Sequence, residues 1–221
     1  MLWFYACYLM TSTKCGLSAK HLERELGVTY KTAWRMLNKI RNNLMAQDGE
    51  APLGERGEVV EADETWWGGK PKASQTRGMT RPEAVTYAKA RKTPVVGVVQ
   101  RHGPVRLLVS RKGERAPDAV RKHVHPNARL MTDDWVGYHK MGHPGEHETI
   151  AHSERVYASG DVHTNTIEGF FGNVKNGIAG NYHGVSRKWL QGYLNEYAWR
   201  LNHRDEPRAD FETLLLRSAN L

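Results

Sequence analysis

Cysteine is nearly absent from this sequence, and so is any long apolar run. Cys7 and Cys15 are the only cysteines among 221 residues, which excludes a disulfide framework and any zinc site built by this chain from cysteine alone. No apolar run approaches the roughly 20 residues that a membrane span needs. The apolar opening, Met1 to Met10, is too short to span and has no basic segment before it. We therefore expect no membrane partner, no signal peptide and a cytoplasmic, reducing environment.

Acidic residues are the minority among the charges. The 32 Lys and Arg residues against 24 Asp and Glu give a formal net charge of +8. That sign favours a polyanionic partner but cannot choose between DNA, RNA and a membrane surface. With 39% hydrophobic and 25% charged residues, the composition is typical of a soluble globular protein. The length fits one large domain, or a small module joined to a core of ordinary domain size.

Residues 1–45 have the pattern of a small all-α helix-turn-helix module. Residues 2–13 are apolar and compatible with a helix. Ser18 and Thr29 are each placed to cap a further helix, and Gly27 lies in the turn between the two. The apolar residues of the third helix recur at spacings of four, three and four, which is one face of a helix. They are Ala33, Leu37, Ile40 and Leu44.

The other positions at the start of the third helix are basic or polar. They are Tyr30, Lys31, Thr32, Arg35 and Lys39. A short helix with such an N-terminal half fits docking into the major groove of double-stranded DNA. The alternative is a three-helix cap without DNA contact. We favour DNA binding because basic and small polar residues open the helix, as docking in the groove requires.

After residue 45 the pattern changes. Residues 46–57 are polar and contain three glycines and a proline, so they are predicted to be a linker to a second domain over residues 58–221. That domain is expected to contain four strands with a short helix before the last of them. The strands are predicted at Val59–Asp63, Thr93–Gln100, Val105–Ser110 and Ala128–Thr132, and the helix at Ala116–His123.

The segment between Gly68 and Thr93 is strongly basic. Seven Lys and Arg residues stand there against a single acid, Glu83. We predict an extended hairpin or a mobile loop. The alternatives for its charges are phosphate contact and a solvated surface, and we favour phosphate contact. The residues assigned to DNA there are Lys70, Lys72 and Arg77.

Three acids occupy positions that a two-metal phosphoryl-transfer site would need. Asp63 closes the first predicted strand, where alternation places it on the same face as Glu61 and opposite Glu64. Asp133 follows the fourth strand, and Glu168 lies on a later helical pattern. Carboxylates from separate elements can converge on two divalent cations roughly 3.5–4 Å apart. Without metal such a cluster would repel itself, so the pattern implies a cation.

The second acid has two candidates. Asp133 and Asp134 both lie at the end of a strand, and either can bind a metal. The other would then cap the helix that follows Trp135. We assign the metal to Asp133 and the cap to Asp134.

A helix is predicted from Asn165 to about Ile178. Its apolar arc contains Ile167, Phe170, Phe171, Val174 and Ile178, and a different arc contains Asn165, Glu168, Gly172 and Lys175. Glu168 and Lys175 are two turns apart on one side, so one can reach a metal while the other reaches a DNA phosphate. The alternative is an ordinary amphipathic helix with a solvated polar side. A last long helix is predicted over residues 186–202.

Five segments together resemble one family. They are Ala19–Leu37, Asp63–Lys70, Thr132–Trp135, His163–Phe171 and Tyr193–Arg204. The set is similar to the DDE-class transposases of bacterial insertion sequences, in the family numbered fifteen ninety-five. The resemblance spans nearly the whole chain, and the ordered set is specific although each piece alone is weak. Together with the strand order, it implies an α/β, ribonuclease-H-like mixed-sheet catalytic core behind the helix-turn-helix.

The resemblance also implies an activity and a set of site residues. Asp63 and Asp133 match the first two acids, and Lys175 matches a basic residue after the third. The family pattern offers both Asn165 and Glu168 as the third ligand. We favour Glu168 because a carboxylate binds Mg²⁺ better than an amide does. The cofactor implied is a pair of Mg²⁺ ions, for which Mn²⁺ can substitute.

The implied chemistry is transposition in a bacterial cytoplasm. Water would free a 3′-hydroxyl at the terminal repeats of the insertion sequence, and that hydroxyl would attack target DNA. Holding two ends together requires at least a homodimer. The alternatives are a structure-selective nuclease or resolvase on the same fold, and a helix-turn-helix regulator without catalysis. Family members commonly carry a Cys-rich zinc ribbon first, and this sequence begins without it, so we expect a truncated copy or an omitted module.

Overall fold

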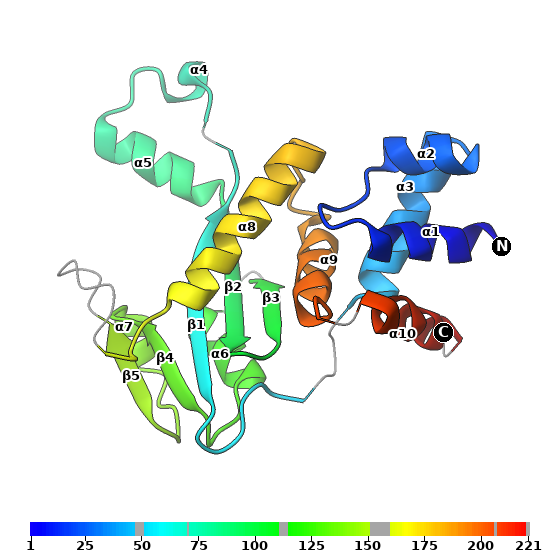
Figure 1. Cartoon of the computed structure of the whole chain (residues 1–221). Coiled ribbons are helices and arrows are strands. Elements are labelled where there is room, and N and C mark those ends of the chain that lie inside the picture. Colours follow the sequence, from blue (N-terminus) through cyan, green and yellow to red (C-terminus); the bar gives the residue numbers. More distant parts are fainter. Residues whose placement is uncertain (47–50, 70, 111–114, 151–159, 206, 220–221) are drawn as a thin grey trace.

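The chain has an α/β part, built from its middle, and a helical part that brings its two ends together (Figure 1). The computed structural model describes residues 1–46, 51–69, 71–110, 115–150, 160–205 and 207–219, without the side chains of residues 207–209. Within these ranges, no helix has both the length and the apolar composition needed to cross a membrane.

Five strands form one mixed sheet in the order β3-β2-β1-β4-β5. They are β1 Val59–Trp67, β2 Thr93–Gln100, β3 Val105–Val109, β4 Arg129–Asp133 and β5 His147–Ile150. The first three are antiparallel neighbours, whereas β4 lies parallel to β1 and β5 parallel to β4. The predicted α/β fold with a ribonuclease-H-like mixed sheet is confirmed.

The sequence pattern predicted β1 too short, and it did not predict β5. β1 continues four residues beyond Asp63, to Trp67, because it pairs with β2 along its whole length. β5 was missed altogether. It is a four-residue edge strand in which only Ile150 is buried, so it lacks the apolar run or alternation that identifies longer strands.

The basic segment between β1 and β2 is helical, so the predicted hairpin or mobile loop is wrong. It contains α4 (Ala73–Thr76) and α5 (Arg81–Ala90). α5 begins with a capping box in which the backbone N–H of Thr80 donates to Glu83 at 2.7 Å, and such a box favours a helix start. Neither helix buries a residue, which explains why hydrophobic periodicity did not reveal them.

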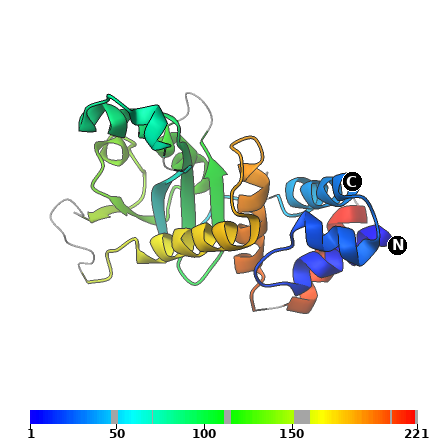
Figure 2. The same cartoon turned by 90° about the horizontal axis from the view of Figure 1, so that it is seen from above.

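Helices cover both faces of the sheet. On one face lies α8 (Asn165–Tyr182), which packs on odd-numbered residues of β2 such as Val95 and Val99. Even-numbered residues of β2 face α6 (Ala116–His123) on the other side. Gly97 allows α8 to approach closely, since a Cβ there would lie 2.5 Å from Ile167 Cδ1. Figure 2 shows α8 lying along the sheet.

The helical part begins as predicted. It contains α1 (Leu2–Ser12), α2 (Ala19–Leu26), α3 (Tyr30–Lys39) and the π-helical turn η1 (Ile40–Leu44). The predicted caps are confirmed, because the side chains of Ser18 and Thr29 accept hydrogen bonds from the backbone N–H groups of His21 and Thr32. The four apolar residues predicted to face inward on the third helix are all buried.

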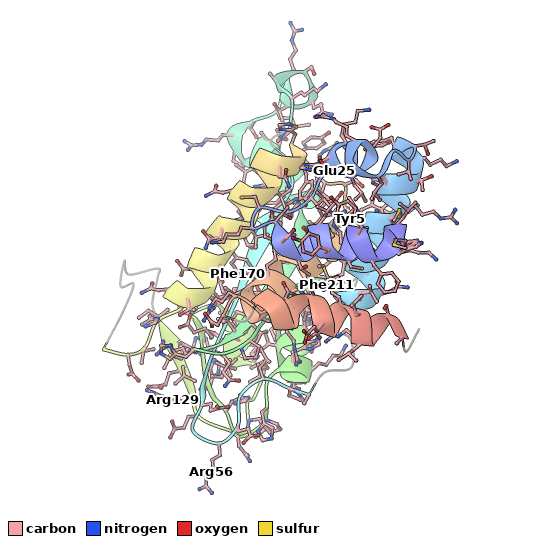
Figure 3. All side chains as sticks on the ribbon, turned by 45° about the vertical axis from the view of Figure 1, so that its right-hand side comes forward. Tyr5, Glu25, Arg56, Arg129, Phe170 and Phe211 are labelled. Carbon is pink, nitrogen blue, oxygen red and sulfur yellow. The ribbon has the colours of Figure 1, made fainter. Side chains whose placement is uncertain are left out.

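The C-terminal helices join this module to the sheet. α9 (Leu190–Asn202) starts four residues later than predicted and packs along β3, and it is followed by α10 (Pro207–Ala219), which was missed. Leu214 of α10 and Trp199 of α9 are buried in the same cluster as the N-terminal helices. In Figure 3, Tyr5 of α1 and Phe211 of α10 lie on neighbouring helices. The division into residues 1–45 and 58–221 stays a prediction, and this packing crosses it.

A buried ion network sits where the two parts meet. Glu196 of α9 is fully buried and accepts hydrogen bonds from Arg41 of η1 at 2.7 Å and from Arg200 at 2.8 Å. Tyr182, the last residue of α8, donates to the same carboxylate at 3.2 Å. Burial raises the pKa of Glu196, but the two arginines outweigh it and the pKa is lowered. The network therefore ties α8, α9 and η1 together with its charges paired.

Candidate active site

Alternate residues of β1 face α8 and contact it in sequence order. The carboxylate of Glu61 accepts hydrogen bonds from the backbone N–H groups of Thr166 and Ile167, at 2.9 and 3.2 Å. Four residues further along the strand, Thr65 accepts a hydrogen bond from Lys175 at 2.5 Å. Asp63 lies between these two contacts on the same face of the strand. The strand and the helix therefore run side by side along the candidate site.

The second acid comes from the neighbouring strand. β4 pairs with β1 in parallel, with Glu61 opposite Met131, so extending that register by two residues brings Asp133 beside Asp63. Asp133 is the last residue of β4 and is half-buried. The strand begins at Arg129, which Figure 3 shows at the end of the sheet far from Phe170 of α8.

The charges of the two other candidate acids act on Asp63. The pKa of Asp63 is raised from 3.8 to about 7, mainly by burial. The backbone N–H of Glu64 lowers it, and the charges of Asp133, Glu168 and Glu64 raise it. Among the described residues, no Lys or Arg forms an ion pair with Asp63. The site therefore concentrates negative charge around a carboxyl group that burial already disfavours as an anion.

As they stand, these side chains are not gathered around an ion. Over the ranges that the structure describes, no three His, Cys, Asp or Glu residues form a group that could hold a metal. Asp63 accepts from the N–H of Glu64 at 2.7 Å, Asp133 from the N–H of Trp135 at 3.2 Å, and Glu168 from the hydroxyl of Thr164 at 2.8 Å. Because an ionised carboxylate has about four acceptor positions on its two oxygens, each of these hydrogen bonds is compatible with binding a cation as well. The donor set itself, oxygen-only and mutually repelling, fits a hard divalent cation.

The assignment of a capping role to Asp134 is wrong. Helix α7 (Val136–His139) has Trp135 as its N-cap residue, and the carboxylate that accepts the N–H of Trp135 belongs to Asp133. Trp135 itself has an extended backbone, and among the described residues no side chain caps the helix. The choice of Asp133 over Asp134 as the metal ligand stays a prediction.

The third position also stays open. Glu168 lies in the first turn of α8, is exposed, and contributes to the raised pKa of Asp63. Asn165 is the first residue of the helix and is exposed as well. The two side chains are three residues apart and so lie on the same side of the helix.

The residues predicted to contact DNA lie on two exposed surfaces. On α3, every one of the five is exposed; they are Tyr30, Lys31, Thr32, Arg35 and Lys39. The second surface is the α4–α5 arm, residues 71–92, which projects beyond β1 in Figure 1. Lys72 and Arg77 are exposed on it, and Lys70 lies outside the described residues. Lys175 is exposed on α8, beside β1.

The sequence did not predict the contact of Glu61 with α8 or the contact of Glu64 with Tyr138. Alternation placed these two acids on opposite faces of β1, and this is confirmed, because Glu61 contacts α8 while Glu64 accepts a hydrogen bond from Tyr138 of α7 at 3.1 Å. Burial raises the pKa of Glu64, and the hydroxyl of Tyr138 lowers it. The only signal for Glu61 in the sequence was its position two residues before Asp63, a candidate metal ligand.

Comparison with known proteins adds two findings. The model of the ISXO2-like transposase domain matches residues 55–202. An uncharacterized protein in transposable element ISH50 of Halobacterium salinarum (strain ATCC 700922 / JCM 11081 / NRC-1) is 25% identical over 228 residues, which cover 98% of this chain and 74% of that protein. No solved structure matches the chain. That relative is archaeal, and the bacterial cytoplasmic origin expected for this chain stays a prediction.

Proposed function

Because the chain belongs to the family of the ISXO2-like transposase domain, we propose that it cuts DNA strands at the ends of an insertion sequence and joins them to target DNA. One observation carries this proposal. The charges of Asp133 in β4 and of Glu168 in α8 both act on the carboxyl group of Asp63 in β1 and raise its pKa. A site in which carboxylates from separate elements raise one another's pKa is suited to bind divalent cations.

The catalytic residues are Asp63, Asp133 and Glu168, with Asn165 as the other candidate for the third ligand. When bound, two Mg²⁺ ions, or Mn²⁺ in their place, would activate the attacking oxygen and neutralise charge on the leaving oxygen. Asp63 must lose its proton to take part, which its raised pKa opposes below about pH 7.

Lys175 is proposed to bind a phosphate next to the scissile bond. Its ammonium group lies against Thr65, two residues after Asp63 on the same face of β1. This places a point positive charge beside the acidic site, where a DNA backbone would run. Charge on this side chain orients the substrate without taking part in proton transfer.

Two surfaces are proposed to hold the double-stranded DNA. The exposed face of α3 would read the terminal repeat in the major groove, through Lys31, Thr32 and Arg35. The α4–α5 arm, with Lys72 and Arg77, would contact phosphates of the terminal repeat or of target DNA. Cutting and joining two ends in one event requires a homodimer or a larger assembly.

The test uses the full chain with Mg²⁺ and a duplex that ends in the terminal repeat. We expect a nick at the repeat tip and, with a target plasmid present, covalent joining of the freed 3′-hydroxyl. Asp63→Asn and Asp133→Asn should abolish both steps while a gel shift still shows DNA binding. Nicking without joining would favour the nuclease or resolvase instead, and binding without either reaction would favour the regulator.

Two comparisons between variants decide the open assignments. Activity that survives Asp133→Asn but not Asp134→Asn would reverse the choice between those acids. Glu168→Gln that nicks as well as the wild type, together with an inactive Asn165→Ala, would move the third ligand to Asn165. Both outcomes keep the reaction and change only the residue that serves it.

A further inference from the structure

A fully buried glutamate, Glu61, lies two residues before Asp63 on β1. Although its side chain has no exposed surface, both carboxylate oxygens accept hydrogen bonds. One accepts from Arg101 Nε at 2.7 Å and from the hydroxyl of Thr166 at 2.9 Å, and the other accepts from the N–H groups of Thr166 and Ile167. Such saturation leaves no oxygen for a metal. It makes Glu61 an anchor for the start of α8 rather than a ligand.

Arg101 extends the anchor to a third element. It follows β2 and is mostly buried, with 16% of its side chain exposed. Besides Glu61, its guanidinium donates to the sulfur of Met131 in β4 and to the carbonyl oxygen of His163, each at 3.1 Å. One buried ion pair therefore contacts β1, β4 and the segment that leads into α8.

The contacts share one spacing. In each of the three elements, the residue that the pair holds lies two positions before a proposed metal ligand. Glu61 precedes Asp63, Met131 precedes Asp133, and Thr166 precedes Glu168. In the two strands, a spacing of two keeps the anchor and the acid on the same face. In α8, the hydrogen bonds of Thr166 to Glu61 hold the first turn of the helix, which also contains Glu168.

We propose that Glu61 and Arg101 form a positioning clasp that sets the mutual distance of Asp63, Asp133 and Glu168, and thereby the affinity of the site for divalent cations. The inference rests on the proposed function, since it concerns the same three acids. Residues that orient metal ligands without touching the metal typically change affinity 10- to 100-fold when they are replaced. The carboxylate of Glu61 also lies 3.3 Å from Nδ1 of His163, in the segment that leads into α8.

The alternative is that Glu61 stabilises the fold and has no bearing on the metal. A matched control separates the two, because Glu196 is equally buried and also bonded to arginine, but lies at the far end of α8 near Tyr182. Glu61→Gln and Glu196→Gln both remove a buried charge from an ion network. Only the first should alter the acidic site.

The experiment titrates the full-length protein with Mn²⁺ in the absence of DNA, by calorimetry or by the electron paramagnetic resonance of the ion. Glu61→Gln should weaken binding about 10- to 100-fold, and Glu61→Asp should weaken it less. Glu196→Gln, although less stable, should bind Mn²⁺ as the wild type does. The Mg²⁺ concentration needed for half-maximal nicking should shift in parallel for the Glu61 variants alone.

Two results would overturn the clasp: Mn²⁺ affinity unchanged in Glu61→Gln, or weakened equally in Glu196→Gln. Should Glu61→Gln fail to fold, Arg101→Lys keeps the charge while losing the fork of donors, and should weaken binding in the same direction. Asp63→Asn is titrated alongside. If it also binds Mn²⁺ like the wild type, the proposed metal site fails, and not only the clasp.

Discussion

An acid lies near each end of helix α8, and the pKa values of the two acids are shifted in opposite directions. Near its start, Asp63 is only half-buried, yet its pKa rises to about 7 because burial and neighbouring acids disfavour its charge. At its end, Glu196 is completely buried, yet its pKa is lowered because Arg41 and Arg200 contact it. Burial is the largest cause of the raised pKa at Asp63, whereas at Glu196 the two arginines outweigh the effect of burial. An acid whose pKa other acids raise indicates a binding site, whereas an acid that accepts hydrogen bonds from two arginines indicates a structural joint.

The largest expected effect tests the first half of this comparison. Asp63→Asn should lower the rate of nicking by a factor on the order of 10⁴ or more, as losses of single members of a catalytic set do. It should not lower the free energy of unfolding, because the amide removes a charge that its neighbours disfavour. Nicking assays and urea denaturation of the same preparation measure the two effects. A variant that is inactive because it unfolds more easily would contradict this assignment.

The second prediction breaks the joint at the other end of α8. Glu196→Gln should lower the free energy of unfolding by about 3–5 kcal/mol, because it leaves two arginines buried without a counter-charge. Urea denaturation checks this. The control is Asp205→Asn, which removes the partner of Arg204 in an ion pair that is 48% and 85% exposed, and which should cost nothing measurable. A loss at position 196 no larger than that of the control would show that the junction is not held by this network.

The pH dependence of stability should have opposite signs at the two sites. Asp63 binds a proton more tightly in the folded chain than in the unfolded chain, so metal-free stability should fall by up to about 3–4 kcal/mol as pH rises from about 4 to 7. Glu196 has a lowered pKa, so its contribution is present above its unfolded pKa near 4.5 and is lost as pH falls. Denaturation curves of Asp63→Asn and Glu196→Gln against pH separate the two slopes.

Magnesium sharpens the same comparison. Because a cation must displace the proton of Asp63, stabilisation by Mg²⁺ should grow as pH rises through about 7 in the wild type. Thermal melts at pH 6 and pH 8, with and without Mg²⁺, measure this growth. Glu196→Gln should keep it, and Asp63→Asn should lose it. Equal stabilisation at both pH values would mean that Asp63 carries no proton to displace.

The smallest effect concerns the surface of the helical part, where charges are exposed and screened. Lys31→Ala and Arg35→Ala should each weaken binding of the terminal-repeat duplex and reduce the slope of log affinity against log salt by about 0.9 per lost phosphate contact. Fluorescence anisotropy at several salt concentrations measures both quantities. Lys20→Ala on α2, where the lysine pairs with Glu23, serves as the control. An unchanged slope would argue for the three-helix cap without DNA contact.

Features encoded by short spacings were predicted well from the sequence. Ser18 and Thr29 cap their helices through residues three positions away, and the buried face of α3 follows from local periodicity. The apolar arc of α8, from Ile167 to Ile178, is also buried as predicted. In each case the signal and the structure it specifies lie within one or two turns of the chain.

Features that depend on distant partners were not predicted. The role of Glu61 depends on Thr166, 105 residues away, and nothing near Glu61 in the chain announces that contact. α10 has no pattern of its own that shows it packing against α1, at the opposite end of the sequence. The α4–α5 arm buries no side chain, so its helices rest on capping rather than on hydrophobic periodicity.

Helix α9 has a consequence for where the DNA would be cut. Its Tyr193, Leu194 and Ala198 are buried against the sheet and α8, while its Trp199 is buried among the N-terminal helices. Trp34 of α3 also packs edge-on against Trp189, directly before α9, with ring centroids 4.7 Å apart. On the proposed function, the packing of α9 therefore sets the distance between the bases that α3 reads and the phosphodiester at Asp63. Lengthening the peptide around residues 46–57 would leave that distance unchanged.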